Sequence, residues 1–276
     1  MLYQLSYSRL SGGYYMIQAV HPQLFFREWG SGYPVVVLHG LFGASDNWAT
    51  VSKLLAERYR VIAVDLRNHG LSFHSPIHRY PDIAADIARL LDDLGIISAS
   101  VIGHSMGGKV AMQFAADFPD MIDRLVVVDI LPFPYEPHHD DVFAGLKAVP
   151  LGQIRRRPEA ESAMEPYVHD HTLRLFLLKS LGFRLEDGSA YWKFNLDGLM
   201  SEYLHIVAAP LIVTRVLTPS LFIMGGLSEY RVEEGDRLRR ALFLNSEIEV
   251  IPNAGHWVHG QYPERVAELV FSHVGE

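Results

Sequence analysis

A serine between glycines is the residue of this chain best suited to covalent chemistry. The stretch GHSMGG, residues 103–108, contains the pattern G-x-S-x-G, with the apolar run ASVI before it and a helical pattern after it. In that context the pattern predicts a tight strand-to-helix turn, because flanking glycines leave room for a strained backbone at Ser105. Such a turn exposes the Ser105 hydroxyl at the edge of the sheet and points the Met106 N–H at a developing oxyanion. The motif therefore predicts a nucleophilic serine.

A second oxyanion donor is expected from the loop LHGLFGASDNW, residues 38–48, which follows the continuous apolar strand PVVVL. In the architecture built around G-x-S-x-G, a backbone N–H of this loop faces the nucleophile. We expect the N–H of Leu41 to be the donor, with Phe42 as the next choice. Without the serine motif, the same loop is typical of an ordinary strand-to-helix turn.

A histidine that could act as general base lies in NAGHWVH, between the last apolar strand and the last helical pattern. A base in this position can take the Ser105 proton and return it to the leaving group. The chain order serine, acid, histidine favours His256. His259 is close in sequence but less well placed.

Three residues compete to orient that histidine. Asp129 ends the apolar run RLVVVD, directly after the helix that follows Ser105. Ser228 stands where the loop after the strand SLFIMGG usually carries the acid, and Glu229 is one residue beyond it. A carboxylate fixes the tautomer of the histidine and stabilises its charged form, which a serine does only weakly. We therefore expect Asp129 to be the acid, although it could instead cap the turn into LPFP.

Alternating apolar and amphipathic segments must position these side chains. Continuous apolar runs such as PVVVL and RVIAVD predict strands that are buried on both faces. The segment YPDIAADIARLLDDLG, residues 80–95, predicts a helix with proline in its first turn and Gly95 at its end. Strands separated by helices of this length indicate an α/β fold with a mostly parallel central sheet and helices on both faces.

The alternation stops at Leu131 and resumes near Ala209. We expect residues 131–209 to form an inserted helical cap without a buried strand, and residues 1–130 and 210–276 to form the α/β core. Several apolar side chains of the insertion could line an acyl pocket, although helix packing is the more ordinary role of such residues. They are Phe143, Leu146, Phe176, Leu177, Trp192, Leu199 and Tyr203.

Composition excludes several classes of protein. Lys and Arg number 24 against 32 Asp and Glu, and this net charge of −8 disfavours nucleic acid as a partner. The chain has no cysteine, which excludes a thiolate nucleophile and is consistent with a reducing, cytoplasmic setting. No apolar run has the length of a membrane span, and the first residues do not resemble a signal peptide. Met16 could be the original start.

No cofactor or metal ion is expected. The cluster His138, His139, Asp140 and Asp141 is contiguous, and adjacent residues rarely converge on one ion. His169 and His171 are interpreted in the same way. The chain also lacks the glycine-rich motifs that bind nucleotide phosphates.

The chain resembles the α/β-hydrolase superfamily, and more narrowly the small bacterial esterases related to the mitochondrial α/β-hydrolase-domain proteins. The resemblance covers nearly everything from Val35 onward and is carried by HGLFGASDNW, VDLRNHGLS, IGHSMGGKVAMQFA, VVVDILP, HDDVFAGLKAV, FLLKSL, FNLDGLMSEYLHIV, LFIMGGLSEYR and AGHWVHGQYPE.

This resemblance implies a cofactor-free serine esterase that acts on short- to medium-chain acyl esters, with acyl thioesters as a related class. It assigns Ser105, His256 and Asp129 to the catalytic machinery, with Ser228 assisting. It also implies that Asp65, Arg67 and His69 brace the loop below the site.

Two other kinds of function stay open. Carbon–carbon bond hydrolases and perhydrolases use a serine on the same scaffold, whereas dehalogenases and epoxide hydrolases of this fold use an aspartate at the position of Ser105. A non-catalytic binding protein could also keep the fold, and Ser228 at the usual acid position is the one feature in its favour.

Overall fold

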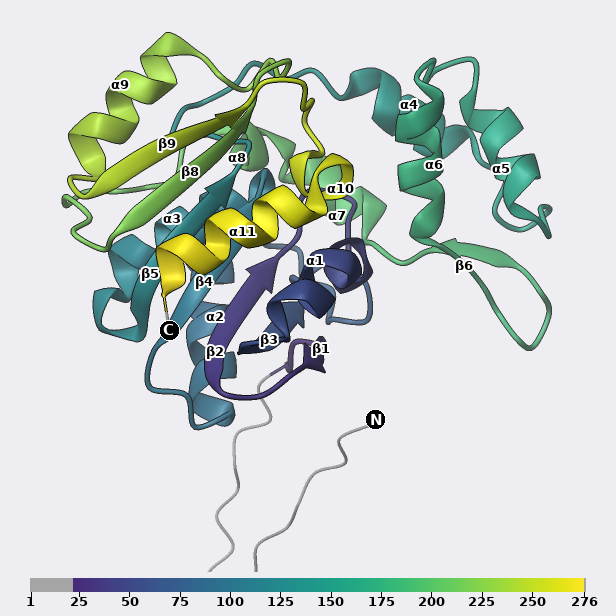
Figure 1. Cartoon of the computed structure of the whole chain (residues 1–276). Helices are drawn as coiled ribbons and strands as arrows, with labels where there is room; N and C mark the ends of the chain where they lie inside the picture. Colours follow the sequence, from purple (N-terminus) through teal and green to yellow (C-terminus); the bar gives the residue numbers. More distant parts are fainter. Residues whose placement is uncertain (1–21, 276) are drawn as a thin grey trace, which may run out of the picture.

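The computed structural model describes residues 22–275, so Met16 and the segment before it lie outside the described residues. A seven-stranded sheet in the order β1-β3-β2-β4-β5-β8-β9 occupies the centre (Figure 1). Its strands are β1 (Phe26–Trp29), β2 (Tyr33–Leu38), β3 (Tyr59–Val64), β4 (Ala99–His104), β5 (Ile122–Val128), β8 (Ser220–Gly225) and β9 (Ser246–Ile251). All neighbouring strands are parallel except β1 and β3. The predicted α/β fold with a mostly parallel sheet is confirmed.

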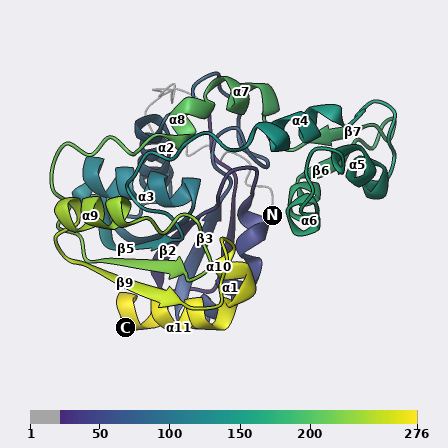
Figure 2. The ribbon, with the colours of Figure 1, turned by 90° about the horizontal axis from the view of Figure 1, so that it is seen from above.

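Helices cover both faces of the sheet, as Figure 2 shows. One face carries α2 (Tyr80–Asp93), α3 (Met106–Asp117) and α9 (Glu233–Leu242), and the other carries α1 (Ala49–Leu55) and α11 (Pro263–Val274). In β2, Val36 and Leu38 join one buried cluster, while Val35 and Val37 join the other. A strand that buries both faces needs apolar side chains at every position, which explains its continuous apolar run.

Strand β1 was not predicted. It pairs antiparallel with β3, from Phe26 opposite Val64 to Trp29 opposite Val61. Its sequence FREW is short, and its side chains are only partly buried or exposed. An edge strand of this kind produces neither a continuous apolar run nor a long alternation, so the sequence gives little sign of it.

Residues 131–209 form a group of short elements, part of which extends to one side of the sheet (Figure 1). The helices are α4 (Asp140–Ala148), α5 (Arg157–Met164), α6 (His171–Lys179), α7 (Leu196–Ser201) and α8 (Tyr203–Val207). The expectation of helices without a strand was wrong, because β6 (Leu181–Phe183) pairs antiparallel with β7 (Ala190–Trp192). Strands this short carry no readable period, and Gly188, with φ of 67°, lies in the turn between them.

Three short elements complete the described chain: the 3-10 helices η1 (Ser45–Trp48) and η2 (Pro119–Met121), and α10 (Val258–Gln261). Across residues 22–275, every helix is too short or too polar to traverse a lipid bilayer.

The candidate site residues share one edge of the sheet. Ser105 follows β4, Asp129 follows β5, Ser228 follows β8 and His256 follows β9. Parallel strands end at the same edge, so the topology gathers side chains that are far apart in the sequence.

Candidate active site

Ser105 occupies a strained turn between β4 and α3. Its backbone has φ of 53° and ψ of −120°, outside the regions that ordinary residues prefer. A Cβ at Gly103 would lie 2.1 Å from the Gly107 carbonyl oxygen, and one at Gly107 would lie 2.4 Å from the His39 carbonyl oxygen. Both positions therefore require glycine, which explains why glycine flanks the serine in the G-x-S-x-G motif of this chain.

A chain of hydrogen bonds joins Ser105, His256 and Asp129. His256 Nε2 lies 3.1 Å from Ser105 Oγ, and His256 Nδ1 lies 2.7 Å from Asp129 Oδ2. Because a carboxylate oxygen only accepts, Nδ1 carries the proton and Nε2 is left to accept from the serine hydroxyl. The Asp129 side chain is fully buried, so its hydrogen bond to His256 is shielded from water.

The Asp129 carboxylate has further donors. Its Oδ1 accepts from the Gly225 N–H at 2.7 Å, and its Oδ2 also accepts from Ser228 Oγ at 2.5 Å. Ser228 Oγ in turn accepts the Tyr230 N–H at 3.2 Å. Glu229 is exposed. The structure thus brings Asp129 to His256 and Ser228 to Asp129, and leaves Glu229 at the surface.

The loop after β2 lies close to the serine. Phe42 has φ of 61°, and its N–H donates to His69 Nε2 at 3.2 Å, so this N–H is already engaged. Within residues 22–275, the N–H groups of Leu41 and Met106 have no protein acceptor. Leu41 and Met106 both line the cavity that contains Ser105, so they retain the donors that the sequence predicts.

The other histidines near the site have different contacts. His104 Nε2–H donates to the His256 carbonyl oxygen at 2.8 Å, which ties the strand before Ser105 to the histidine loop. His259 stacks on Trp48, with ring centres 4.4 Å apart. Burial lowers the pKa of both His104 and His259, the latter to about 3, so both rings are neutral near neutral pH.

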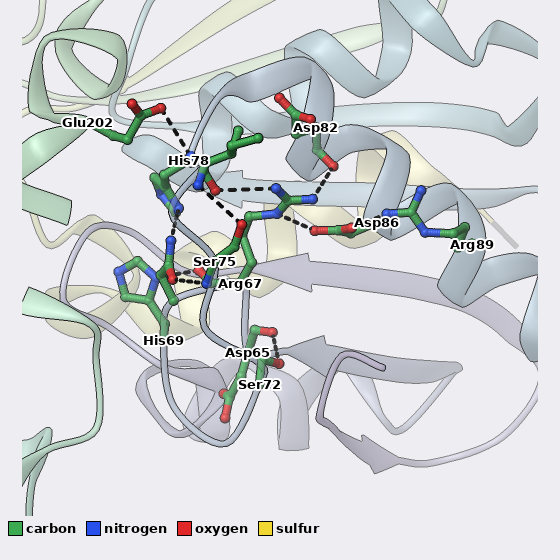
Figure 3. A network of polar contacts seen from close by, with 12 residues as sticks. Asp65, Arg67, His69, Ser72, Ser75, His78, Asp82, Asp86, Arg89 and Glu202 are labelled. Carbon is green, nitrogen blue, oxygen red and sulfur yellow. Dashed lines mark hydrogen bonds and ion pairs between the residues drawn. The ribbon is translucent and has the colours of Figure 1, made fainter. Parts of the chain in front are cut away.

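The segment DLRNHG braces two loops, as the resemblance implies. Asp65 accepts the N–H groups of Ser45 and Leu71, and His69 accepts the Phe42 N–H. Arg67 forms a buried ion pair with Asp86 at 2.5 Å, and Figure 3 shows it within the surrounding polar network.

Two contacts of the site were not predicted from sequence. The Tyr230 ring lies over His256, with ring centres 4.3 Å apart. His78 Nε2 lies 3.3 Å from Met106 Sδ, behind the turn that presents the Met106 N–H. Neither residue belongs to a chemical motif, so no sequence signal distinguished them.

The cavity over Ser105 has a volume of about 810 Å³ including its open mouth. Of the insertion residues proposed to line an acyl pocket, Phe176 and Tyr203 border the cavity. The others pack in the core, which is the more ordinary role that we weighed for them: Phe143, Leu146, Leu177, Trp192 and Leu199.

His138 and His139, two of the four histidines that were considered as metal ligands, face tyrosines. His138 Nε2 lies 2.8 Å from the Tyr230 hydroxyl, and His139 Nδ1 lies 2.6 Å from the Tyr203 hydroxyl. His138 Nδ1 also lies 2.7 Å from the Glu136 carbonyl oxygen, so both ring nitrogens of His138 are engaged.

A strained serine at a strand-to-helix turn, backed by a histidine and a buried carboxylate on a mostly parallel sheet, defines a class of hydrolases. The family described as alpha/beta hydrolase fold matches residues 33–263. The chain belongs to this family.

Relatives with named activities are similar over most of their length. Esterase YbfF of Escherichia coli (strain K12) is 39% identical over 238 residues, covering 86% of this chain and 91% of that protein. The Mus musculus protein named sn-1-specific diacylglycerol lipase ABHD11 is 38% identical over 247 residues, covering 86% of this chain and 80% of that protein. The solved structure of a marine microorganism esterase matches with a TM-score of 0.88 at 35% identity, covering 92% of this chain and 100% of that one.

These similarities make the protein a serine ester hydrolase that acts on a small-molecule ester. They confirm the resemblance on which the sequence-based expectation rested. They do not favour the carbon–carbon hydrolase, perhydrolase or binding-protein hypotheses.

Proposed function

We propose that Ser105, His256 and Asp129 form a catalytic triad that hydrolyses short- to medium-chain acyl esters through an acyl-enzyme on Ser105. The observation that carries this proposal is the hydrogen-bond chain from Ser105 Oγ through His256 to the buried Asp129 carboxylate, beside the cavity that Ser105 and His256 line.

In the acylation step, His256 Nε2 takes the Ser105 proton while Oγ attacks the ester carbonyl carbon. The N–H groups of Leu41 and Met106 stabilise the negative oxygen that forms. Asp129 stabilises the charged imidazolium and holds its tautomer, and Ser228 assists by donating to the same carboxylate oxygen. The imidazolium then returns its proton to the departing alcohol, and the acyl group stays on Ser105.

In the deacylation step, His256 activates a water molecule, which attacks the acyl-enzyme carbonyl and releases the acid. The same attack serves acyl thioesters, since only the leaving atom changes. The cavity wall is rich in apolar side chains such as Leu173 and Phe176, which suits an alkyl chain. Absence of cysteine and the acidic net charge support a cytoplasmic enzyme without a nucleic-acid partner.

The first test measures hydrolysis of p-nitrophenyl esters from acetate to laurate by the wild type and by Ser105→Ala. We expect the rate to be highest for short to medium chains. The variant should lose nearly all activity, by on the order of 10⁴-fold or more, because no other nucleophile is available. A butyryl thioester assayed in parallel tests the thioester class.

Covalent labelling with a fluorophosphonate completes this test. The wild type should label at Ser105, and Ser105→Ala should not. A wild type that neither labels nor turns over any ester would contradict the proposal and favour a binding protein. Labelling together with activity only on a dienoic ketone would favour carbon–carbon hydrolysis.

A further inference from the structure

The cavity wall contributed by the segment before α4 carries a histidine whose protonated nitrogen is fixed by its neighbours. The Tyr203 hydroxyl oxygen accepts the N–H of His138 at 3.1 Å and that of His139 at 3.1 Å. Since both lone pairs of this oxygen are used, its O–H donates, and its partner is His139 Nδ1 at 2.6 Å. Nδ1 is therefore the acceptor nitrogen, and the ring proton is on Nε2.

The Nε2–H of His139 is a donor without a protein partner among residues 22–275. His139 lines the cavity, its ring is half-buried, and Nε2 is not among the unpaired atoms sealed from solvent. The ring lies edge-on to that of Phe42, with centres 6.4 Å apart, so it faces the loop that carries Leu41. Burial, together with the nearby His138 and His256, lowers the pKa of His139 to about 3, so the ring is neutral near neutral pH.

Three other polar side chains that line the cavity, those of Tyr80, Tyr135 and Lys109, are already bonded, whereas the unpaired Trp48 Nε1 and His259 Nδ1 are sealed from solvent. The Tyr80 hydroxyl donates to the Ile206 carbonyl oxygen, and the Tyr135 hydroxyl donates to the Tyr230 carbonyl oxygen. The Lys109 ammonium is held by the carbonyl oxygens of residues 207 and 208. A neutral donor that stays unpaired in a wall rich in apolar side chains costs free energy unless the ligand supplies an acceptor.

We propose that His139 is a specificity-determining residue whose Nε2–H binds a second acceptor oxygen of the substrate, remote from the scissile carbonyl. The substrate class is an ester that also carries an ether, hydroxyl or further carbonyl oxygen. Tyr203 acts through His139 and is a positioning residue. This inference rests on the proposed function, because it concerns the same cavity.

The test compares esters that differ only by an oxygen in place of a methylene. One set comprises p-nitrophenyl esters of straight alkanoic acids and their analogues with an ether oxygen at successive chain positions. A second set comprises butyrate esters of alkanols and of the matching alkoxyalkanols, followed by pH-stat. The quantity measured is the ratio of kcat/KM for each ether to that for its alkyl partner. Comparing wild type with His139→Phe cancels the intrinsic reactivity of the esters.

We expect the ratio to fall about fivefold in His139→Phe for at least one oxygen position, which is the size of a neutral hydrogen bond. His139→Gln can place an amide N–H near the position of Nε2 and should retain most of the ratio. In Tyr203→Phe the ring proton of His139 can occupy either nitrogen, so the ratio should fall. The kcat/KM of the alkyl esters should change less. This variant also keeps the inference testable if His139→Phe fails to fold.

Equal ratios in wild type, His139→Phe and Tyr203→Phe at every position in both sets would overturn the inference while leaving the esterase proposal intact. A wild type that hydrolyses no ester of either set and does not label at Ser105 would overturn the proposed function, and the inference with it.

Discussion

Asp129 combines an unusual backbone with a fully satisfied carboxylate. Its φ of 55° lies in the left-handed region, and its N–H donates to the Ile223 carbonyl oxygen at 2.9 Å. The carboxylate receives donors from Gly225, Ser228 and His256. These three donors hold the carboxylate in the position from which it accepts from His256 Nδ1 and can stabilise an imidazolium. The strain is therefore located at the residue whose charge the proposed chemistry uses.

Replacing Asp129 with Asn should lower kcat strongly, with a smaller effect on KM. The amide keeps the shape but can donate to Nδ1, which places the His256 proton on the wrong nitrogen. In a well-studied serine protease this kind of change costs on the order of 10⁴-fold in kcat. We expect a loss of roughly 10² to 10⁴-fold here, measured by steady-state hydrolysis of p-nitrophenyl butyrate.

Glu229→Gln is the matched control, because it neutralises the exposed carboxylate in the same loop as Ser228. It should change kcat by no more than a few-fold. If Asp129→Asn stays within a few-fold and Glu229→Gln does not, the acid has been misassigned.

Sequence reasoning predicted Asp129 because parallel strands end at one edge, so a carboxylate directly after a neighbouring strand had to lie near the nucleophile. It could not predict the Tyr230 ring over His256 or the tautomer of His139. The first depends on how the loops after β8 and β9 pack against each other, and the second on how the segment before α4 packs against α8. No residue type or spacing encodes either arrangement.

At the scale of elements, one loop supports both predicted oxyanion donors. In the loop between β3 and α2, His69 holds the Phe42 N–H, and His78 reaches Met106 Sδ. Asn68 Oδ1 accepts the Ser75 N–H at 2.7 Å, so its Nδ2 donates to His78 Nδ1 at 3.3 Å. The proton of His78 is consequently on Nε2, directed at the sulfur. This loop, seen in Figure 3, therefore supports the two segments that carry the predicted oxyanion donors, and none of residues 65–79 lines the cavity.

His69→Leu should lower kcat about tenfold, less than the 10²-fold or greater loss that follows removal of an oxyanion donor itself. The Phe42 N–H would lose its acceptor, and the neighbouring Leu41 N–H would lose its fixed direction. A buried donor without a partner also lowers the free energy of unfolding by about 1–3 kcal/mol. The measurements are kcat and KM on p-nitrophenyl butyrate, together with urea unfolding.

His69→Gln supplies a side-chain oxygen that can accept the same N–H, so it should recover most of the lost kcat. Unchanged kcat in His69→Leu, despite lower stability, would show that His69 supports the fold and not the oxyanion loop.

The elements themselves were predicted unevenly. Strands β2, β4 and β5 were clear because both of their faces are buried, and α2 was clear because its apolar stripe ends at a glycine with φ of 65°. The edge strand β1 and the β6–β7 pair were not predicted, because strands of four and three residues are too short to show a hydrophobic periodicity.

At the scale of the whole molecule, burial keeps many titratable groups uncharged. It lowers the pKa of His78, His139 and His259 to about 3 and that of Lys109 to about 7, and it raises the pKa of Tyr33 to about 12. The unfolded chain titrates these groups near about 6.5, 10.4 and 10 for His, Lys and Tyr. Folding and protonation are therefore coupled over a wide range of pH.

The free energy of unfolding should rise with pH up to about 10 and then fall. Below about pH 6.5 the unfolded state binds protons that the buried histidines do not, so stability is lost as the pH falls. His78, His139 and His259 together account for a slope of about 4 kcal/mol per pH unit. Between about pH 7 and 10 Lys109 gives a shallower rise for the same reason. Above about pH 10 the unfolded state loses tyrosine protons that Tyr33 keeps, so stability falls.

Urea unfolding at several pH values between about 5 and 10 measures this profile. His259→Gln should reduce the slope of the unfolding free energy below about pH 6.5 by roughly the contribution of one proton. The reason is that a buried histidine that titrates only in the unfolded state has been removed. His74→Gln, which changes an exposed side chain, is the matched control and should leave the slope as it is. A flat profile between about pH 5 and 6.5 in the wild type would contradict this prediction. It would mean that these histidines take up protons in the folded chain, which requires water to reach the interior beside Ser105.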